Sequence, residues 1–369
     1  MTIDARDALV VPLYGDDNRT LQVGERTSRR MNGRTRATFL LAGLGAIALI
    51  TILLFVVGTG RVVDALRTAR PAYVALTFGL ALCWLAAWGL MLRTVLGVLD
   101  VRIPVVTALF VYAGAVFANN VTPFGQAGGE PVAALIISKI TESRYETGLV
   151  GIASVDVLNV VPSISLIFVG ISYYATTAAI GQRLETAVTS AVVLIGGVIL
   201  VIGVVWRYRE RIGERLPAVL SSIAGRLGRS RVDAEAFEAE LNDRLDHFFE
   251  NIERIATSRW RLGAVVGLSL TGWLFQTAAL VVAFAALGHS IPAYVALFVI
   301  PLANVAGAAP LPGGLGGIDL AFVALLVPTT GIAASTVTAA VLIFRGAVYW
   351  MPIVVGGISV SAFGVRSLS

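Results

Sequence analysis

Long apolar runs, separated by short polar stretches, fill most of the chain. A helix of about 20 apolar residues crosses a bilayer, and several of the runs reach that length. The runs lie at 38–57, 72–92, 103–121, 131–141, 147–174, 187–206, 262–287, 292–309, 318–328 and 334–363. Those at 131–141 and 318–328 are too short to cross alone. The pattern predicts an all-α integral membrane protein, folded as a polytopic helical bundle.

Two polar regions divide this pattern into parts. We expect a polar tail over 1–36, a first membrane half over 37–206, a polar segment over 207–260 and a second membrane half over 261–369. Within the polar segment, one apolar stripe at helical spacing consists of Phe237, Leu241, Leu245, Phe248, Ile252 and Ile255. The stripe predicts an amphipathic helix on the bundle or lipid surface, and a partner-binding coiled coil is the alternative.

Two strings rich in glycine and proline interrupt the apolar runs. Residues 122–130 read TPFGQAGGE and residues 310–319 read PLPGGLGGID, so the broken segments cover 119–141 and 304–328. Proline blocks helix continuation, and glycine lets the backbone approach a ligand closely. The strings therefore predict two pairs of discontinuous or re-entrant helices. Whether each broken segment crosses fully or re-enters stays open.

The two strings share a register. Gly125 precedes Gly314 by 189 positions, and Trp84 precedes Trp273 by the same 189. Following the predicted topology, the run at 72–92 and the run at 262–287 cross the membrane in opposite directions. We therefore expect an inverted repeat, an architecture that recurs in transporters.

The broken segments supply most of the candidate site. Half-helix N-termini offer N–H groups and positive dipole ends to anionic groups. The expected substrate-binding residues are Asn120, Pro123, Gly125, Gly128, Glu130, Pro312, Gly313, Gly314, Gly317, Asp319 and Arg345. The alternative is that the glycines and prolines only permit close packing and kinks, and that Glu130 and Asp319 cap their helices first and bind ligand second.

Arg345 stands well inside the last apolar run. A buried arginine requires a wet cavity, an anion or a carboxylate partner. Asp156 precedes it by 189 positions. An ion pair between Asp156 and Arg345 is therefore one hypothesis, and a lipid phosphate held by Arg345 is the other.

Composition and charge narrow the classes of function. Apolar residues make up 57% of the chain, charged residues only 14%, and mean hydropathy is +0.83, values that exclude a water-soluble globule of this length. The net charge of +5 comes from arginines beside the membrane segments, which indicates a cytoplasmic N-terminus and C-terminus in the cell membrane and argues against nucleic-acid binding. With one cysteine and two distant histidines, we expect no metal and no cofactor.

The motifs resemble one known family. TPFGQAGGE, PLPGGLGGID, LIFRGAVYWMPIVVGG and SRWRLGAVVGLSLTGWL are similar to motifs of the membrane domain of lysylphosphatidylglycerol synthases, which also occurs alone in flippase-like UPF0104 proteins. The resemblance covers about 35 to 365. The family's fourth helix commonly carries a glutamate–arginine pair, whereas ASVDVLNVVP offers only Asp156.

The resemblance implies a lipid flippase or scramblase for an anionic or amino-modified lipid or a lipid-linked sugar carrier. We expect the partner to be a membrane lipid headgroup, and a homo-oligomer or an enzyme partner stays open. No aminoacyl-transferase domain is evident, so lysyl transfer is not implied. A membrane subunit of a lipid- or glycan-modifying enzyme and a structural scaffold are the competing hypotheses.

Overall fold

The computed structural model describes residues 48–122, 126–177, 259–308 and 311–366. These residues form helices and connecting turns, and the described part of the chain holds no strand. The helices are Ala48–Val57, α2 (Thr59–Arg67), α3 (Pro71–Val98), α4 (Val105–Val121), α5 (Gln126–Thr141), α6 (Tyr145–Thr177), α10 (Arg259–Ala286), α11 (Ala293–Val305), α12 (Gly317–Thr330), α13 (Ala334–Arg345) and α14 (Met351–Arg366). The expected all-α bundle is confirmed.

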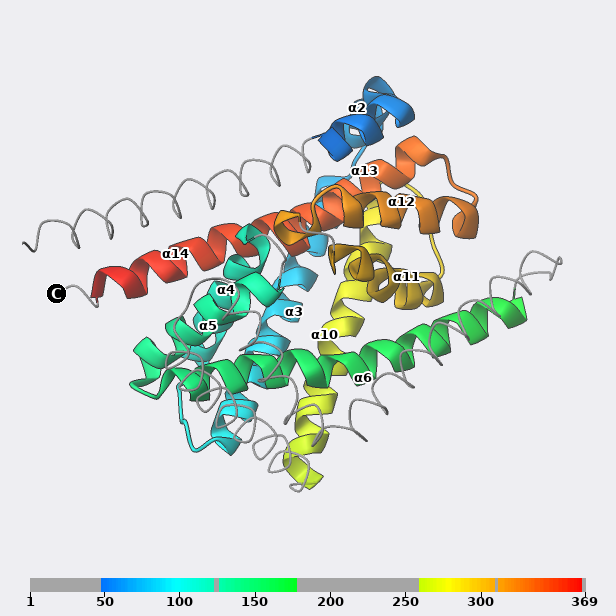
Figure 1. Ribbon diagram of the computed structural model, residues 1–369. Coiled ribbons are helices and arrows are strands. Elements are labelled where there is room, and N and C mark those ends of the chain that lie inside the picture. The colour runs from blue at the N-terminus through cyan, green and yellow to red at the C-terminus, as the bar shows by residue number, and fades with distance from the viewer. Residues whose placement is uncertain (1–47, 123–125, 178–258, 309–310, 367–369) are drawn as a thin grey trace, which may run out of the picture.

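Helices α3 and α10 cross at the centre of the bundle (Figure 1). The Trp88 indole N–H of α3 donates to the Ser269 carbonyl of α10 at 3.2 Å. A Cβ built on Gly272 would overlap the Trp88 ring, so the absence of a side chain at Gly272 permits this close crossing. Both helices contain 28 residues and arise from the predicted runs at 72–92 and 262–287.

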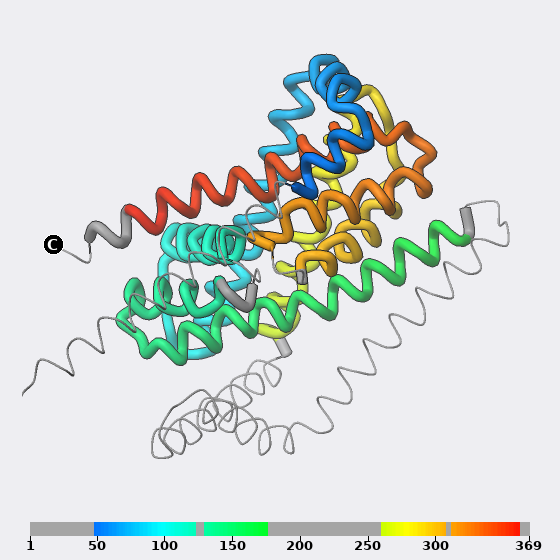
Figure 2. The backbone as a smooth tube through the Cα atoms, turned by 45° about the horizontal axis from the view of Figure 1, so that its top comes forward, coloured from blue at the N-terminus to red at the C-terminus, as the bar shows by residue number. Residues whose placement is uncertain are grey.

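The other helices flank this central pair on two sides. In Figures 1 and 2, α4, α5 and α14 lie on one side of it, α11, α12 and α13 lie on the other, and α6 runs past both groups. Helix α4 packs against α5 and α14, while α11 packs against α12 and α6. Helix α4 also packs against the 3₁₀ turn Pro312–Gly314 of the second broken segment.

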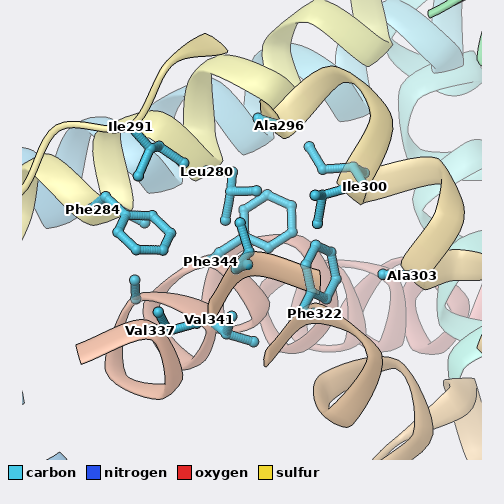
Figure 3. Packing of buried hydrophobic residues seen from close by; sticks show 14 of the residues in the cluster. Leu280, Phe284, Ile291, Ala296, Ile300, Ala303, Phe322, Val337, Val341 and Phe344 are labelled. Carbon is cyan, nitrogen blue, oxygen red and sulfur yellow. The ribbon is translucent and has the colours of Figure 1, made fainter. Parts of the chain in front are cut away.

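One large apolar core lies among α10, α11, α12 and α13. Figure 3 shows Phe322 of α12 and Phe344 of α13 inside it, with ring centroids 5.5 Å apart. Leu280 and Phe284 of α10 and Ile300 of α11 belong to the same cluster and are at most 1% exposed. Because the outer surface of a membrane protein is also apolar, this interior is distinguished by close packing rather than by composition.

Five described helices are long and apolar enough to cross a membrane. They are Pro71–Val98, Tyr145–Ala175, Trp260–Ala286, Pro312–Thr330 and Ala334–Ser361. The run at 318–328 forms α12, which has 14 residues; the stretch reaches 19 residues only when the 3₁₀ turn before it is included, as Pro312–Thr330. Helix α5, with 16 residues, is not among the five, as predicted for 131–141.

Two predicted spans are shorter than the apolar runs that suggested them. Helix α4 has 17 residues because it begins at Val105, two residues into its run, and α11 has 13 because it ends at Val305, where the second break begins. At about 1.5 Å per residue, α11 covers about 20 Å, less than the apolar thickness of a bilayer. Both are therefore half-helices.

The stretch around Arg61 is helical. This stretch separates the apolar runs at 38–57 and 72–92, yet Thr59–Arg67 forms α2, which meets the helix Ala48–Val57 at a bend of 82°. Gly58, with a φ of 95°, makes the bend. The predicted tail at 1–36, the run at 187–206 and the amphipathic stripe at 237–255 lie outside the described residues.

Candidate functional site

The second broken segment folds into a tight turn followed by a helix. Helix α11 ends at Val305, a 3₁₀ turn follows at Pro312–Gly314, and α12 begins at Gly317. Gly313 and Gly314 have φ values of 52° and 65°, a region that side chains rarely adopt. A Cβ on Gly314 would also come within 2.5 Å of Ile318 Cδ1. The turn thus depends on both glycines.

Asp319 makes two bonds at the start of α12. The Gly316 backbone N–H donates to its Oδ2 at 2.9 Å, which caps the helix. The Arg345 Nε–H donates to its Oδ1 at 3.1 Å. The side chains of Arg345 and Asp319 are only 9% and 8% exposed, so this is a buried ion pair. The expected capping role of Asp319 is confirmed.

The Arg345 guanidinium has two further contacts. Its Nη2 donates to the Gly313 carbonyl at 3.3 Å, and its Cζ lies 4.5 Å from the centre of the Tyr349 ring.

The backbone after Arg345 forms a π-helical turn, Gly346–Trp350, before α14 begins. Such turns occur frequently at functional sites. This turn lies between the arginine that ends α13 and the start of α14.

The hypothesis of an Asp156–Arg345 ion pair is wrong. Arg345 pairs with Asp319 because α13 packs directly against α12, whereas Asp156 of α6 lies beside Glu130 of α5. The carboxyl groups of Glu130 and Asp156 are within hydrogen-bonding reach of each other. Asp156 of α6 is thus next to Glu130 of α5, and Arg345 of α13 is paired with Asp319 of α12.

The start of the first broken segment, at the end of α4, lies against Tyr349 and the turn that holds Gly313. The Tyr349 hydroxyl donates to the Asn120 carbonyl at 3.1 Å, and the Asn120 amide donates back to the Tyr349 carbonyl at 3.4 Å. A Cβ on Gly313 would overlap Tyr349 and lie 3.0 Å from the Asn120 carbonyl oxygen. Asn120, Gly313, Asp319, Arg345 and Tyr349 thus form one cluster, which we call the junction.

Several predicted residues lie elsewhere. Pro123 and Gly125 are outside the described residues, so their role at the site stays a prediction. Gly128 lies in α5. Glu130 does not cap that helix, because α5 begins at Gln126 and leaves the acid in the second turn. Pro312 opens the 3₁₀ turn and Gly317 opens α12.

Three further polar residues lie in the apolar helices, in different surroundings. Asn159 accepts from the Ser269 hydroxyl, a contact that joins α6 to α10. Gln276 is buried, while Asn304 is exposed near the end of α11. Among the described residues, no group of three or more histidines, cysteines or acids is placed to hold a metal ion.

The sequence-based prediction missed Tyr349 and Gly316. Tyr349 follows Arg345 by four residues, a spacing that places two side chains on one helical face. That spacing was a usable signal. Gly316 acts through its backbone N–H, and only the course of the turn shows which N–H group meets Asp319.

Comparisons with known proteins give a consistent result. Residues 41–356 match the family model described as the lysylphosphatidylglycerol synthase TM region. Two UPF0104 membrane proteins of Methanothermobacter thermautotrophicus are each 26% identical, with alignments that cover 90% and 88% of this chain and 95% of each relative. Glycosyltransferase AglD of Haloferax volcanii is 25% identical over 90% of this chain and 56% of its own length.

Proposed function

Because the chain belongs to the family of the lysylphosphatidylglycerol synthase TM region, we propose that it is a flippase- or scramblase-like transporter. Its cargo is an anionic or modified phospholipid, or a lipid-linked sugar carrier, moved between leaflets. One observation carries this proposal: an arginine is buried in an apolar bundle and bonds to the turn of the second broken segment, which lies against Asn120 of the first. Charged residues inside membrane bundles mark substrate pathways.

The bonds of Arg345 suggest how a headgroup phosphate binds. A guanidinium has five N–H donors, and its planar fork matches a phosphate. Contacts to Asp319 and Gly313 account for two of these donors. A phosphate that displaced Asp319 would leave the carboxylate still bonded to the Gly316 N–H. We infer that the Asp319–Arg345 pair is a latch that a phosphate opens by competition.

We also propose that the two halves form an inverted repeat, and three features support it. Trp84 and Trp273, 189 positions apart, each meet Trp88 edge to face with ring centroids 5.4 Å apart. Helix α6 has 33 residues, and the stretch from α13 to α14, residues 334–366, has the same length. Packing of α4 on α14 matches packing of α11 on α6. A repeat of this kind alternates access around a shared site.

For the location, we propose the cell membrane with both termini cytoplasmic. The support is the arginine content of the polar regions, since cytoplasmic loops carry excess basic residues. The proposed partner is a lipid headgroup.

Reconstitution into vesicles tests the transport proposal. The full chain is placed in liposomes with a fluorescent anionic phospholipid, and a membrane-impermeant quencher reports the fraction that reaches the outer leaflet. We expect the wild type to expose the inner-leaflet lipid and Arg345→Lys to slow this strongly, because lysine lacks the fork. Arg67→Lys, at a side chain 76% exposed, is the matched control and is expected to match the wild type.

A neutral glycolipid of equal chain length separates phosphate recognition from general leakage. We expect it to move much more slowly than the anionic lipid. Equal rates for both lipids, or equal rates for Arg345→Lys and the wild type, contradict the proposal.

The second candidate function is a membrane part of a glycan-modifying enzyme. The observation in its favour is the match to AglD, whose name describes a glycosyltransferase. Supplying the same vesicles with a nucleotide sugar and a polyprenyl phosphate tests it. Formation of a glycosylated lipid by the wild type, without lipid movement, would favour this function over transport.

A further inference from the structure

Two carboxyl groups lie together inside the first half of the bundle. Glu130 of α5 and Asp156 of α6 are within hydrogen-bonding reach of each other, and α5 packs along α6. The Asp156 Oδ2 atom is buried and accepts no hydrogen bond from the described residues. A carboxylate oxygen buried without a donor is costly. A donor is therefore required at this oxygen.

The same two positions in the second half hold an acid and a base. Asp319 follows Glu130 by 189 positions, and Arg345 follows Asp156 by the same 189. In the second half the carboxylate receives a hydrogen bond from the guanidinium at 3.1 Å. In the first half, an acid stands where the guanidinium would be, so the pair has two acceptors and no donor of its own.

The neighbours of the pair do not neutralise it. Tyr112 of α4 is buried and close enough to Asp156 to interact electrostatically, but a phenol carries no positive charge. Arg93 of α3 and Arg261 of α10 are exposed and donate to the carbonyls of Ile103 and Gly97. Helix α11, which also packs on α6, has no charged residue.

We propose that Glu130 and Asp156 form a proton-binding site that holds at least one proton at neutral pH. Two carboxylates in contact in a partly buried site inside an apolar bundle do not both ionise readily. The proton bonds to an oxygen of one carboxyl group and is donated to an oxygen of the other, and water is its source and its sink. In the first half it therefore takes the place that the guanidinium has in the second, and such a site suits a proton-coupled transporter.

Infrared spectroscopy of the purified full chain, without added lipid, tests the site directly. At about pH 8, exposed acids are ionised, so we expect a carbonyl band of protonated carboxyl in the wild type. Glu130→Gln supplies an amide donor to Asp156 and Asp156→Asn supplies one to Glu130, so each is expected to remove the band. Asp64→Asn, at a side chain 74% exposed, is the matched control and leaves it unchanged.

The wild-type spectrum alone can overturn the proposal, so it does not depend on the variants folding. Absence of the band contradicts it, as does a band that persists in both Glu130→Gln and Asp156→Asn. A band that disappears on adding sodium or potassium chloride at constant pH would indicate a metal cation in place of the proton and would also contradict it.

Stability against pH gives a second readout. A folded state that binds one proton more than the unfolded state loses stability as pH rises, with up to a tenfold change in the unfolding equilibrium constant per pH unit. We expect this slope from about pH 5, just above the usual carboxyl pKa, up to neutral pH in the wild type and a flatter profile in Glu130→Gln. Equal slopes contradict the proposal. Neither measurement involves lipid movement, so failure of the transport proposal would leave both results interpretable.

Discussion

The buried ion pair at the junction makes a sharp prediction about stability. Replacing Arg345 by methionine keeps most of the side-chain volume and leaves the Asp319 carboxylate buried without its cation. Removing one partner of a buried pair costs about 3 to 5 kcal/mol. The side chains are 9% and 8% exposed, so solvent screening does not reduce this figure much. Arg345→Met is therefore expected to lower the free energy of unfolding by about 3 to 5 kcal/mol.

Asp319→Asn provides the other side of a double-mutant cycle. Its amide oxygen still accepts from the Gly316 N–H, so the helix cap is kept while the charge is lost. The single variant leaves the Arg345 guanidinium unpaired, and the double variant leaves no buried charge at either position. We expect the double variant to lose less than the two single variants together, with a coupling energy of about 1 to 3 kcal/mol.

Equilibrium unfolding in mixed micelles, followed by tryptophan fluorescence, measures the cycle. The surface pair Asp64–Arg67, at 3.4 Å with side chains 74% and 76% exposed, is the matched control, and its cycle is expected to show little coupling. Additive losses at Asp319 and Arg345, within about 0.5 kcal/mol, would refute the reasoning. The latch would then not exist as a mutual interaction.

Three further substitutions test close contacts, two at the junction and one at the α3–α10 crossing. Gly313→Ala is expected to lower both stability and lipid movement, because its Cβ would overlap Tyr349. The control is Gly331→Ala, which has a φ of 69° but no atom within 4 Å of its Cβ, so it tests backbone strain without the contact. Similar effects of the two variants would contradict the steric argument. Tyr349→Phe deletes the bond to the Asn120 carbonyl, and a loss of about 1 kcal/mol in unfolding free energy is expected, so an unchanged value would count against the bond. Gly272→Val is expected to disrupt the α3–α10 crossing and to reduce the yield of folded protein, and a normal yield with normal melting would show that this crossing can adjust.

Much of the fold follows from the sequence alone. The runs at 72–92 and 262–287 predicted α3 and α10, because a long apolar segment is stable only in lipid or in a protein core, and as a helix it satisfies its own backbone. Pro312 and Gly313 marked the second break for an equally local reason. Proline lacks the backbone N–H that a helix interior needs, and glycine tolerates positive φ, whatever packs around them.

Helix limits within the apolar runs were less predictable. The sequence overestimated α11, since apolar residues continue past its end at Val305 into the break that follows. The stretch around Arg61, between two apolar runs, is also helical. Charge alone does not distinguish a polar loop from a helix that lies beside the bundle.

Which charged residues meet was decided only by the tertiary structure. The shared offset of 189 suggested an ion pair between Asp156 and Arg345, but equal spacing along the sequence does not bring two side chains into contact. Each side chain instead contacts its neighbour within its own half, Asp156 with Glu130 and Arg345 with Asp319, because α5 packs on α6 and α12 packs on α13. A sequence records the charges, while the pairing depends on which helix faces lie within about 4 Å of each other, and that distance is set by packing over the whole bundle.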